Sequence, residues 1–427
     1  MKIRRLGFIE TYCKIAHDCN GSYNLITVAK FHCEHKLTPD VIYKAGKLLF
    51  DQYAILQSAI TKEENTGFFW FILNEKSFDN QAVIAINDIG QKSLTATIEF
   101  FLENRFTDEL LWRMQFILDE HSHSHYVVLS AHHAILDGFS AVKFINQLIK
   151  NIEDINTGES RKIIPIPTAV ENRFAKKTGA LKFIFSLLQK KLLSFARNSQ
   201  VISYELTSVK NATKFVCKTF ANDDLPNWLL ICKQNKIALT ALMHACLIKA
   251  ITQVISIKEG QRLTSTIPAM PDKNTAVTSA EIGCLMAPIE IENTVTEKKS
   301  VLEIAQQTQK SIRKNMAVAC KFPYQLTVLI QKLIVQDITK PKQAFKYCCQ
   351  ISNLGVIDEL FDMQTKNSLQ ELFFFTSRNN ADVLMSLYLA TFNGKLYLTF
   401  AYLYPLLGKK NAEQIVQHFY ANLQLFS

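Results

Sequence analysis

The hydrophobic pattern of the first 150 residues predicts strands and helices mixed along the chain. Residues 22–33 are strand-like, and Thr38-Pro39-Asp40 then indicates a helix start with proline at the first helical position. Residues 111–118 alternate as a strand, and the apolar run at 126–130 completes an expected hairpin. Further strands are expected at 68–73 and 82–86, and further helices at 93–105 and 139–150.

The second half repeats this mixture after an interruption at residues 152–200. Asn393-Gly394 between two apolar runs is the strongest local hairpin signal, and 369–376 is expected to join that antiparallel set. Strands are expected at 201–206, 213–220, 263–267, 345–351, 369–376, 383–390 and 395–401, and helices at 223–234, 239–255, 300–318, 324–335 and 411–425. The order of elements favours an α/β or α+β fold, with two halves of similar make-up.

Composition is typical of a globular protein. The 427 residues are 48% hydrophobic and 20% charged, which argues against a disordered chain and a coiled coil. The ten cysteines include no CxxC pair, so we expect reduced core thiols and a cytoplasmic protein. We expect neither a signal peptide nor a membrane-spanning helix, because the chain lacks a long uncharged apolar stretch.

The formal net charge of +10 favours acidic partners. Residues 171–200 are strongly basic, with apolar residues at helical spacing. This segment is interpreted as a crossover between domains, with peripheral contact to an anionic membrane or docking of an acidic carrier protein as alternatives. Nucleic acid is not expected, since no binding motif is present and aromatic residues do not interleave with the basic ones.

The chemistry of the chain is expected around His132 and His133, at the end of a buried strand. Asp137 and Gly138 follow immediately before a predicted helix. A neutral imidazole can take the proton of a hydroxyl or amine as that group attacks, and its ordinary pKa suits neutral pH. Asp137 could fix the turn by pairing with an arginine or with backbone amides, and Gly138 would allow close approach. The alternative from the residues alone is a buried structural histidine pair.

This segment, HHAILDG at 132–138, resembles the His-His-x-x-x-Asp-Gly signature of the chloramphenicol acetyltransferase-like superfamily, which includes peptide-synthetase condensation domains and alcohol acetyltransferases. The likeness extends along the chain in the family's order. Further similar segments lie at 22–53, 54–60, 237–250, 395–398 and Ser352-Asn353-Leu354-Gly355.

The resemblance implies two pseudo-symmetric domains around a central channel, here 1–165 and 201–427 with a basic linker at 166–200. It implies that His133 is a general base, that His132 positions the motif, and that Asp137 and Gly138 shape it. Ser352 or Asn353 could lie near the channel and help to stabilise an oxyanion, as could the backbone amide of Gly138. The alternative for Ser352 and Asn353 is a turn at the end of a strand. No tightly bound cofactor is implied; the co-substrate would be acyl-CoA or a phosphopantetheine thioester.

Three functions remain open at this stage. The leading one is acyl transfer from a thioester to a hydroxyl or amine acceptor. The others are a non-catalytic relative that binds a carrier protein or amphiphile, and a condensation enzyme that forms amides. The chain departs from the family in two places. The Asp-Phe-Gly-Trp-Gly of the plant acyltransferases is absent, which disfavours that branch. Ala269-Met270-Pro271-Asp272 stands where many relatives carry Asn-Leu-Arg, so the usual arginine partner of Asp137 could differ.

A second histidine cluster, His121, His123 and His125, is a candidate metal site. The i, i+2 spacing would place the three side chains on one face of an extended strand. No carboxylate or cysteine partner stands out nearby, so an exposed hairpin loop is the preferred interpretation and no metal is expected.

Overall fold

A computed structural model describes most of residues 2–426. The longest gaps are 175–201, 204–211, 271–279 and 317–343; shorter ones lie at 35, 75–77, 79–83, 89–92, 120, 156–161, 221–223, 258–259, 295–297 and 380–381. The expected helix at 324–335 and nearly all of the basic segment 171–200 therefore lie outside the described residues. Only α5, Val170–Phe174, belongs to that segment.

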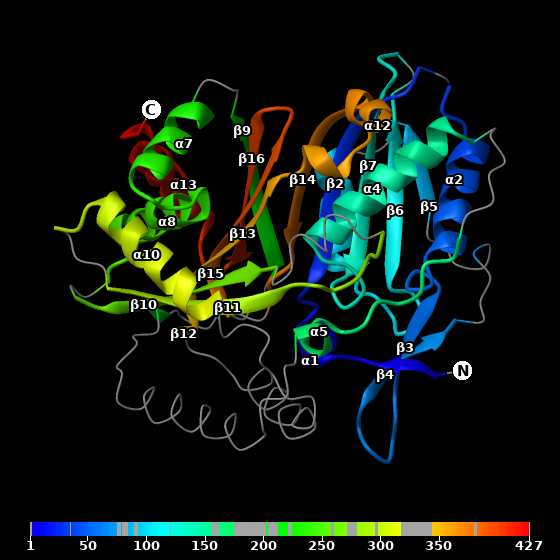
Figure 1. The fold of residues 1–427 in the computed structure, drawn as a ribbon, viewed down its shortest axis with the longest axis horizontal. Coiled ribbons are helices and arrows are strands. Elements are labelled where there is room, and N and C mark those ends of the chain that lie inside the picture. The colour runs from blue at the N-terminus through cyan, green and yellow to red at the C-terminus, as the bar shows by residue number, and fades with distance from the viewer. Residues whose placement is uncertain are drawn as a thin grey trace.

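The N-terminal half is built on a five-stranded sheet in the order β14-β2-β7-β6-β5. Helices α2 and α4 pack against each other on one side of it (Figure 1). Thr38 caps α2 by accepting a hydrogen bond from the Val41 amide at 3.4 Å, as the Thr-Pro start predicted. The elements are β2 (Asn24–His32), α2 (Pro39–Gln52), β5 (Ile84–Asp88), α3 (Leu94–Glu103), β6 (Trp112–Leu118), β7 (Ser124–His132) and α4 (Gly138–Glu153).

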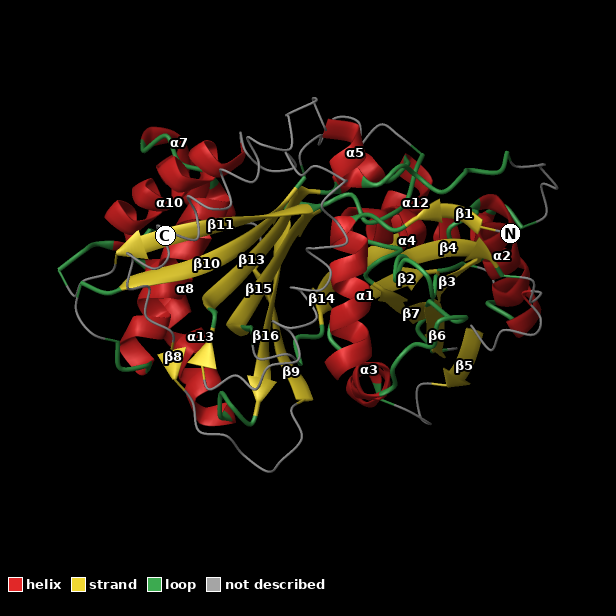
Figure 2. Ribbon diagram, turned by 90° about the horizontal axis from the view of Figure 1, so that it is seen from below, coloured by secondary structure: helices red, strands yellow, loops and turns green. Residues whose placement is uncertain are grey.

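The C-terminal half is built on a six-stranded sheet in the order β11-β10-β13-β15-β16-β9. Every residue of β15 is buried, as expected of a central strand covered on both faces. Helices α7, α8, α10 and α13 gather at the outer end of this half (Figure 2). The elements are β9 (Ala212–Phe220), α7 (Leu225–Gln234), α8 (Leu239–Val254), β10 (Arg262–Ala269), β11 (Ala287–Thr294), α10 (Val301–Met316), β13 (Tyr347–Val356), β15 (Val383–Phe392), β16 (Lys395–Tyr404) and α13 (Lys409–Gln424).

Two segments from the second half of the sequence pack into the first half. Strand β14 (Leu369–Thr376) pairs antiparallel with β2, so its expected place beside β15 and β16 was wrong. Its Phe374 and Phe375 belong to the larger buried cluster, where Phe375 stacks on Phe215 of β9 with ring centroids 4.9 Å apart. The other segment is 281–286, between β10 and β11, whose Ile282 and Cys284 belong to the same core. These crossings bring both halves to the HHAILDG segment.

The remaining elements are smaller. They are β1 (Lys2–Arg5), α1 (Phe8–Asn20), β3 (Ser58–Lys62), β4 (Phe69–Leu73), β8 (Ile202–Ser203), β12 (Ala344–Phe345), a 3-10 turn (Asp358–Leu360) and α12 (Met363–Ser368). Helix α1 and strand β11 were not foreseen from the sequence. The β15–β16 hairpin was predicted correctly, and both Asn393 and Gly394 have the positive φ that its turn requires.

The expected α/β class and the two-lobed arrangement are confirmed. Within the described part of the chain, no single helix is long and apolar enough to span a bilayer. Helices α7 and α8 meet that test only as a pair, and their axes are bent by 101° where they join.

Candidate active site

The HHAILDG segment is a tight connection between β7 and α4. His132 ends β7 and pairs in register with Asn24 of β2. The backbone amide of His133 donates to the Tyr23 carbonyl at 3.0 Å, which holds the chain against β2 as it leaves the sheet. The run of buried apolar residues before His132 makes β7 a central strand, so the histidines emerge from a rigid base.

His132 faces the interior rather than the cavity described below. Its Nδ1 accepts a hydrogen bond from the Ala134 amide at 3.1 Å, and its ring lies 4.6 Å from that of His17. Burial, with the nearby His17, holds the pKa of His132 well below its usual range. A neutral ring that caps the turn from inside fits a positioning residue.

Asp137 connects the two halves of the protein. One carboxylate oxygen accepts from the Ser140 amide at 2.9 Å and so caps α4, and the other accepts from the Leu285 amide at 2.8 Å. Burial raises the pKa of Asp137, and these two hydrogen bonds oppose that rise. Of the two kinds of partner considered from the sequence, the structure therefore shows backbone amides.

Ser140 strengthens the same connection. Its hydroxyl donates to the Gly283 carbonyl at 2.8 Å and accepts from the Gly283 amide at 3.0 Å. The Asp137 amide also donates to the Gly283 carbonyl, at 3.0 Å. The first turn of α4 is thus bound to segment 281–286 through side chain and backbone together.

His133 lies on the wall of a cavity of about 300 Å³ that both halves line. Burial lowers the pKa of His133 to about 4. A hydrogen bond with its own backbone raises this pKa, and the charge of Arg378 lowers it. The ring is therefore neutral at physiological pH and can accept a proton.

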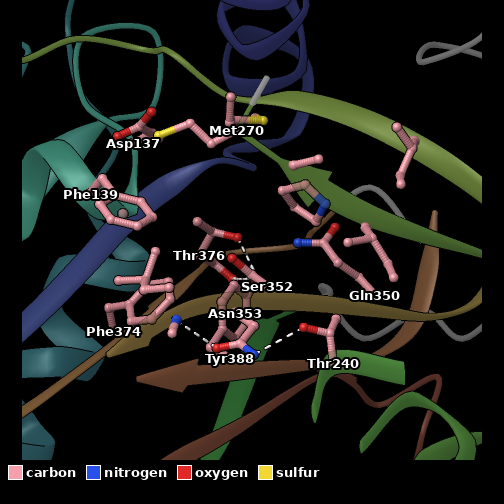
Figure 3. A pocket seen from close by; sticks show the side chains of 18 of the residues that line it. Asp137, Phe139, Thr240, Met270, Gln350, Ser352, Asn353, Phe374, Thr376 and Tyr388 are labelled. Atoms are coloured by element: carbon pink, nitrogen blue, oxygen red, sulfur yellow. Dashed lines mark hydrogen bonds between the residues drawn. The ribbon is translucent and has the colours of Figure 1, made fainter. Parts of the chain in front are cut away.

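The cavity is mainly apolar, and its size is at the lower end for small-molecule sites. Figure 3 shows Asp137 and Phe139 of the N-terminal half on one side and Ser352, Asn353 and Tyr388 of the C-terminal half on the other. Other apolar lining residues are Ile267, Met270, Met286, Ile289, Ile312, Met316, Leu354 and Phe374. Gly138 also lines it, and a Cβ there would approach Leu354 and Phe374 to 3.0 and 3.1 Å.

The two candidate oxyanion residues differ in their availability. The Asn353 side chain donates to Thr240 at 3.0 Å and accepts from the Gly355 amide at 2.7 Å, so both ends of its amide are engaged (Figure 3). The hydroxyl of Ser352 makes no hydrogen bond within the described part of the chain, and Ser352 lines the cavity. Ser352 is therefore the freer donor of the two.

The sequence did not point to a buried arginine beside this site. The guanidinium of Arg378 donates to the Tyr23 hydroxyl and to Gln350 Oε1, and it stacks 4.3 Å from the Tyr23 ring. Tyr23 in turn lies 6.0 Å from the His133 ring. Arg378 lies two residues after β14 and belongs to no sequence motif. Its place beside the site becomes apparent only from the pairing of β14 with β2 in the N-terminal sheet.

The histidines at 121–125 do not converge. His125 is buried and its Nδ1 accepts from the Asp119 amide at 3.2 Å, whereas the hairpin turn exposes His121 and His123. Among the described residues, these three histidines do not form a group that could hold a metal ion.

Comparison with known proteins finds a family model that matches the part of the chain holding the HHAILDG segment. Residues 14–183 match the family model of the condensation domain. The fold is shared with solved condensation domains and with a solved acetyltransferase. The resemblance noted from the sequence is thereby confirmed. A comparison with curated protein sequences finds no match.

Solved structures of the same architecture cover nearly the whole chain. The trichothecene 15-O-acetyltransferase of Fusarium sporotrichioides has a TM-score of 0.77 at 12% identity, covering 99% of this chain and 95% of that one. The polyketide synthase associated protein 5 of Mycobacterium tuberculosis has a TM-score of 0.68 at 12% identity, covering 100% and 99%. The first condensation domain of the calcium-dependent antibiotic synthetase has a TM-score of 0.72 at 10% identity, covering 99% and 95%. At such identities the likeness shows the fold alone.

Proposed function

We propose that this member of the condensation-domain fold is an acyltransferase in which His133 is the general base. The observation that carries the proposal is the position of a buried, neutral His133 on the wall of an apolar cavity between the halves. The family match of the segment that holds it and the acetyltransferase among its structural neighbours support transfer as the reaction type.

The proposed reaction balances without a bound cofactor. A ring nitrogen of His133 takes the proton of the acceptor hydroxyl while the oxygen attacks the carbonyl carbon of the thioester. The carbonyl oxygen becomes an oxyanion, to which the Ser352 hydroxyl can donate. The carbon–sulfur bond then breaks, and the leaving thiolate takes the proton back from His133. The products are an ester and a free thiol.

The donor in this proposal is the thioester of coenzyme A or of a phosphopantetheine arm. Both are anionic, and an acidic carrier protein would be attracted by the net charge of +10. A cytoplasmic location and contact of 171–200 with a membrane remain predictions. The apolar lining of the cavity favours an acyl chain or an acceptor with a hydrophobic body.

The test is His133→Ala against wild type, with a set of acyl-CoA and carrier-bound thioesters and a panel of alcohols and amines, read by mass spectrometry. We expect the variant to stay folded and to lose about 10²–10⁴ in rate, the usual contribution of a general base. His125→Ala is the matched control, because His125 is a buried histidine of β7, the strand that leads to His133, and lies away from the cavity. Full activity of His133→Ala would contradict the mechanism.

A second candidate function is amide formation by condensation of two carrier-bound groups, favoured by the condensation-domain match. Faster product formation with amines than with alcohols would select it. Saturable binding of thioesters with neither transfer nor hydrolysis would instead indicate a non-catalytic relative.

A further inference from the structure

Two cysteines lie beside His133. Cys13 belongs to α1, and Cys284 belongs to segment 281–286, which enters from the C-terminal half. One ligand atom from each of Cys13, His133 and Cys284 can be chosen so that all three atoms lie within 4.8 Å of one another. The three residues are far apart in the sequence, so no spacing pattern foretold this cluster.

The chemistry of the cluster is that of a zinc site. Thiolate and imidazole are the ligands that Zn²⁺ prefers, with Zn–S near 2.3 Å and Zn–N near 2.0–2.1 Å. At tetrahedral angles those lengths place two sulfur atoms about 3.8 Å apart. The three ligand atoms lie within 4.8 Å of one another, so small rotations of the side chains would complete the geometry.

All three groups are available as ligands. Both cysteines are free thiols, and both are almost completely buried. Nδ1 of His133 is buried and has no hydrogen bond of good geometry within the described part of the chain. Binding of the ion would release two thiol protons, and two thiolates would neutralise Zn²⁺, which allows the centre to stay buried.

We propose that Cys13, His133 and Cys284 form a three-ligand site for Zn²⁺ or a similar soft divalent ion, and that an ion held there prevents His133 from acting as a base. The ion reaches the site through the cavity, because His133 lines it. Occupancy of the site therefore sets the fraction of active protein. The fourth position of the ion is left for water or a thiol.

The binding test needs no assumption about activity. The protein is reduced with a thiol-free phosphine, desalted without oxygen and titrated with Co²⁺, whose bonds to thiolate give a charge-transfer absorption band in the near ultraviolet. We expect one Co²⁺ per chain with this band, displaced by Zn²⁺ because Zn²⁺ binds such ligands more tightly. The band also separates this site from any binding by the exposed histidines His121 and His123, which contribute no sulfur.

Variants assign the ligands. Cys13→Ser, Cys284→Ser and His133→Ala are each expected to weaken binding about tenfold or more, since loss of an outer-shell partner alone costs that much. Circular dichroism of each variant shows whether a loss of ion binding reflects misfolding. Cys284→Ala is a second substitution at that position for the same comparison. Cys232→Ser, a buried cysteine in the other core, and Cys19→Ser, an exposed one, are the controls and are expected to bind as wild type.

The inhibition test rests on the proposed function. Zn²⁺ is expected to inhibit acyl transfer by wild type by lowering kcat, reversibly with a chelator, while Cys13→Ser remains active and resistant. Reduced wild type that binds no ion, or a Cys13→Ser/Cys284→Ser double variant that binds as wild type, overturns the site. A protein that binds one ion through these thiols but transfers no acyl group confirms the site and contradicts the proposed function instead.

Discussion

Asp137 of the α4 N-terminus accepts a hydrogen bond from the backbone amide of Leu285 at 2.8 Å. This single carboxylate therefore caps a helix of the N-terminal half and holds a segment that connects two strands of the C-terminal sheet. Because His133 lies four residues before Asp137, the position of the proposed base depends on contact between the halves as well as on its own strand.

Asp137→Ala is expected to lower the free energy of unfolding by about 1.5–5 kcal/mol. Loss of a helix cap costs about 0.5–2 kcal/mol, and the Leu285 amide left without a partner adds about 1–3 kcal/mol. Urea unfolding followed by circular dichroism measures the change.

Asp362→Ala is the matched control for that measurement. Asp362 caps α12 in the same way, accepting from the Thr365 amide at 2.8 Å, but it is part-exposed and caps only a short helix. Its loss should cost no more than about 1 kcal/mol. Equal effects of the two substitutions would show that Asp137 is a helix cap and no more.

The pKa of about 4 at His133 predicts the pH dependence of transfer. A general base must be neutral, so activity is expected above this pKa and lost as the pH falls through it. Between about pH 5.5 and 8 the value of kcat/KM should stay flat for a substrate that does not titrate there. An acid limb near pH 6.5, the ordinary histidine value, would show that the ring is solvated in the free enzyme.

Arg378→Met is expected to move that acid limb to higher pH, by a few tenths of a unit to about one unit. The charge of Arg378 lowers the pKa of His133, and its removal relieves the repulsion of the imidazolium. Methionine keeps much of the volume, although the Tyr23 hydroxyl and Gln350 lose their donor.

The pH profile of kcat/KM measures this effect, with Arg262→Met as the control because Arg262 is exposed at the start of β10. A limb that does not move, in a folded Arg378→Met variant, would contradict electrostatic control of His133 by Arg378.

Much of the fold was predictable because its signals are local. Asn393-Gly394 determines a two-residue hairpin, and the apolar residues of α8 require a buried helix. Helix α1 was missed because its inner face carries Lys14 and His17, which are polar by type but buried here through their partners.

Of the residues at the site, the sequence could predict only the contiguous ones at 132–138. His132 to Gly138 are contiguous, so one motif places all of them. Arg378 and Cys284 reach the same region through pairing of β14 with β2 and through the crossing of segment 281–286. Contacts between residues so far apart leave no periodicity in the sequence. The strand-like pattern of 369–376 is compatible with pairing in either sheet.

A buried histidine away from the site predicts how the fold responds to acid. His244 in α8 is fully buried, and its Nδ1 lies 2.9 Å from the hydroxyl of Thr308. Burial lowers the pKa of His244 to about 3. Its folded pKa is below the unfolded value of about 6.5, so the unfolded chain binds the proton more readily. Stability is therefore greatest above pH 6.5 and falls as the pH decreases toward 3.

His244→Leu removes this titration. We expect the free energy of unfolding of the variant to be lower by about 1 kcal/mol at pH 7.5, because the hydrogen bond to Thr308 is lost. The Thr308 hydroxyl still accepts from the Asn293 side-chain amide at 3.0 Å. Wild type should lose about 2 kcal/mol from His244 between pH 7 and 5, and the variant should be spared that loss. Urea unfolding at several pH values measures both slopes. His418→Leu, on the C-terminal helix α13 and outside both of these cores, controls for the replacement of a histidine by leucine. Parallel curves for wild type and His244→Leu would mean that His244 remains able to take a proton in the folded protein.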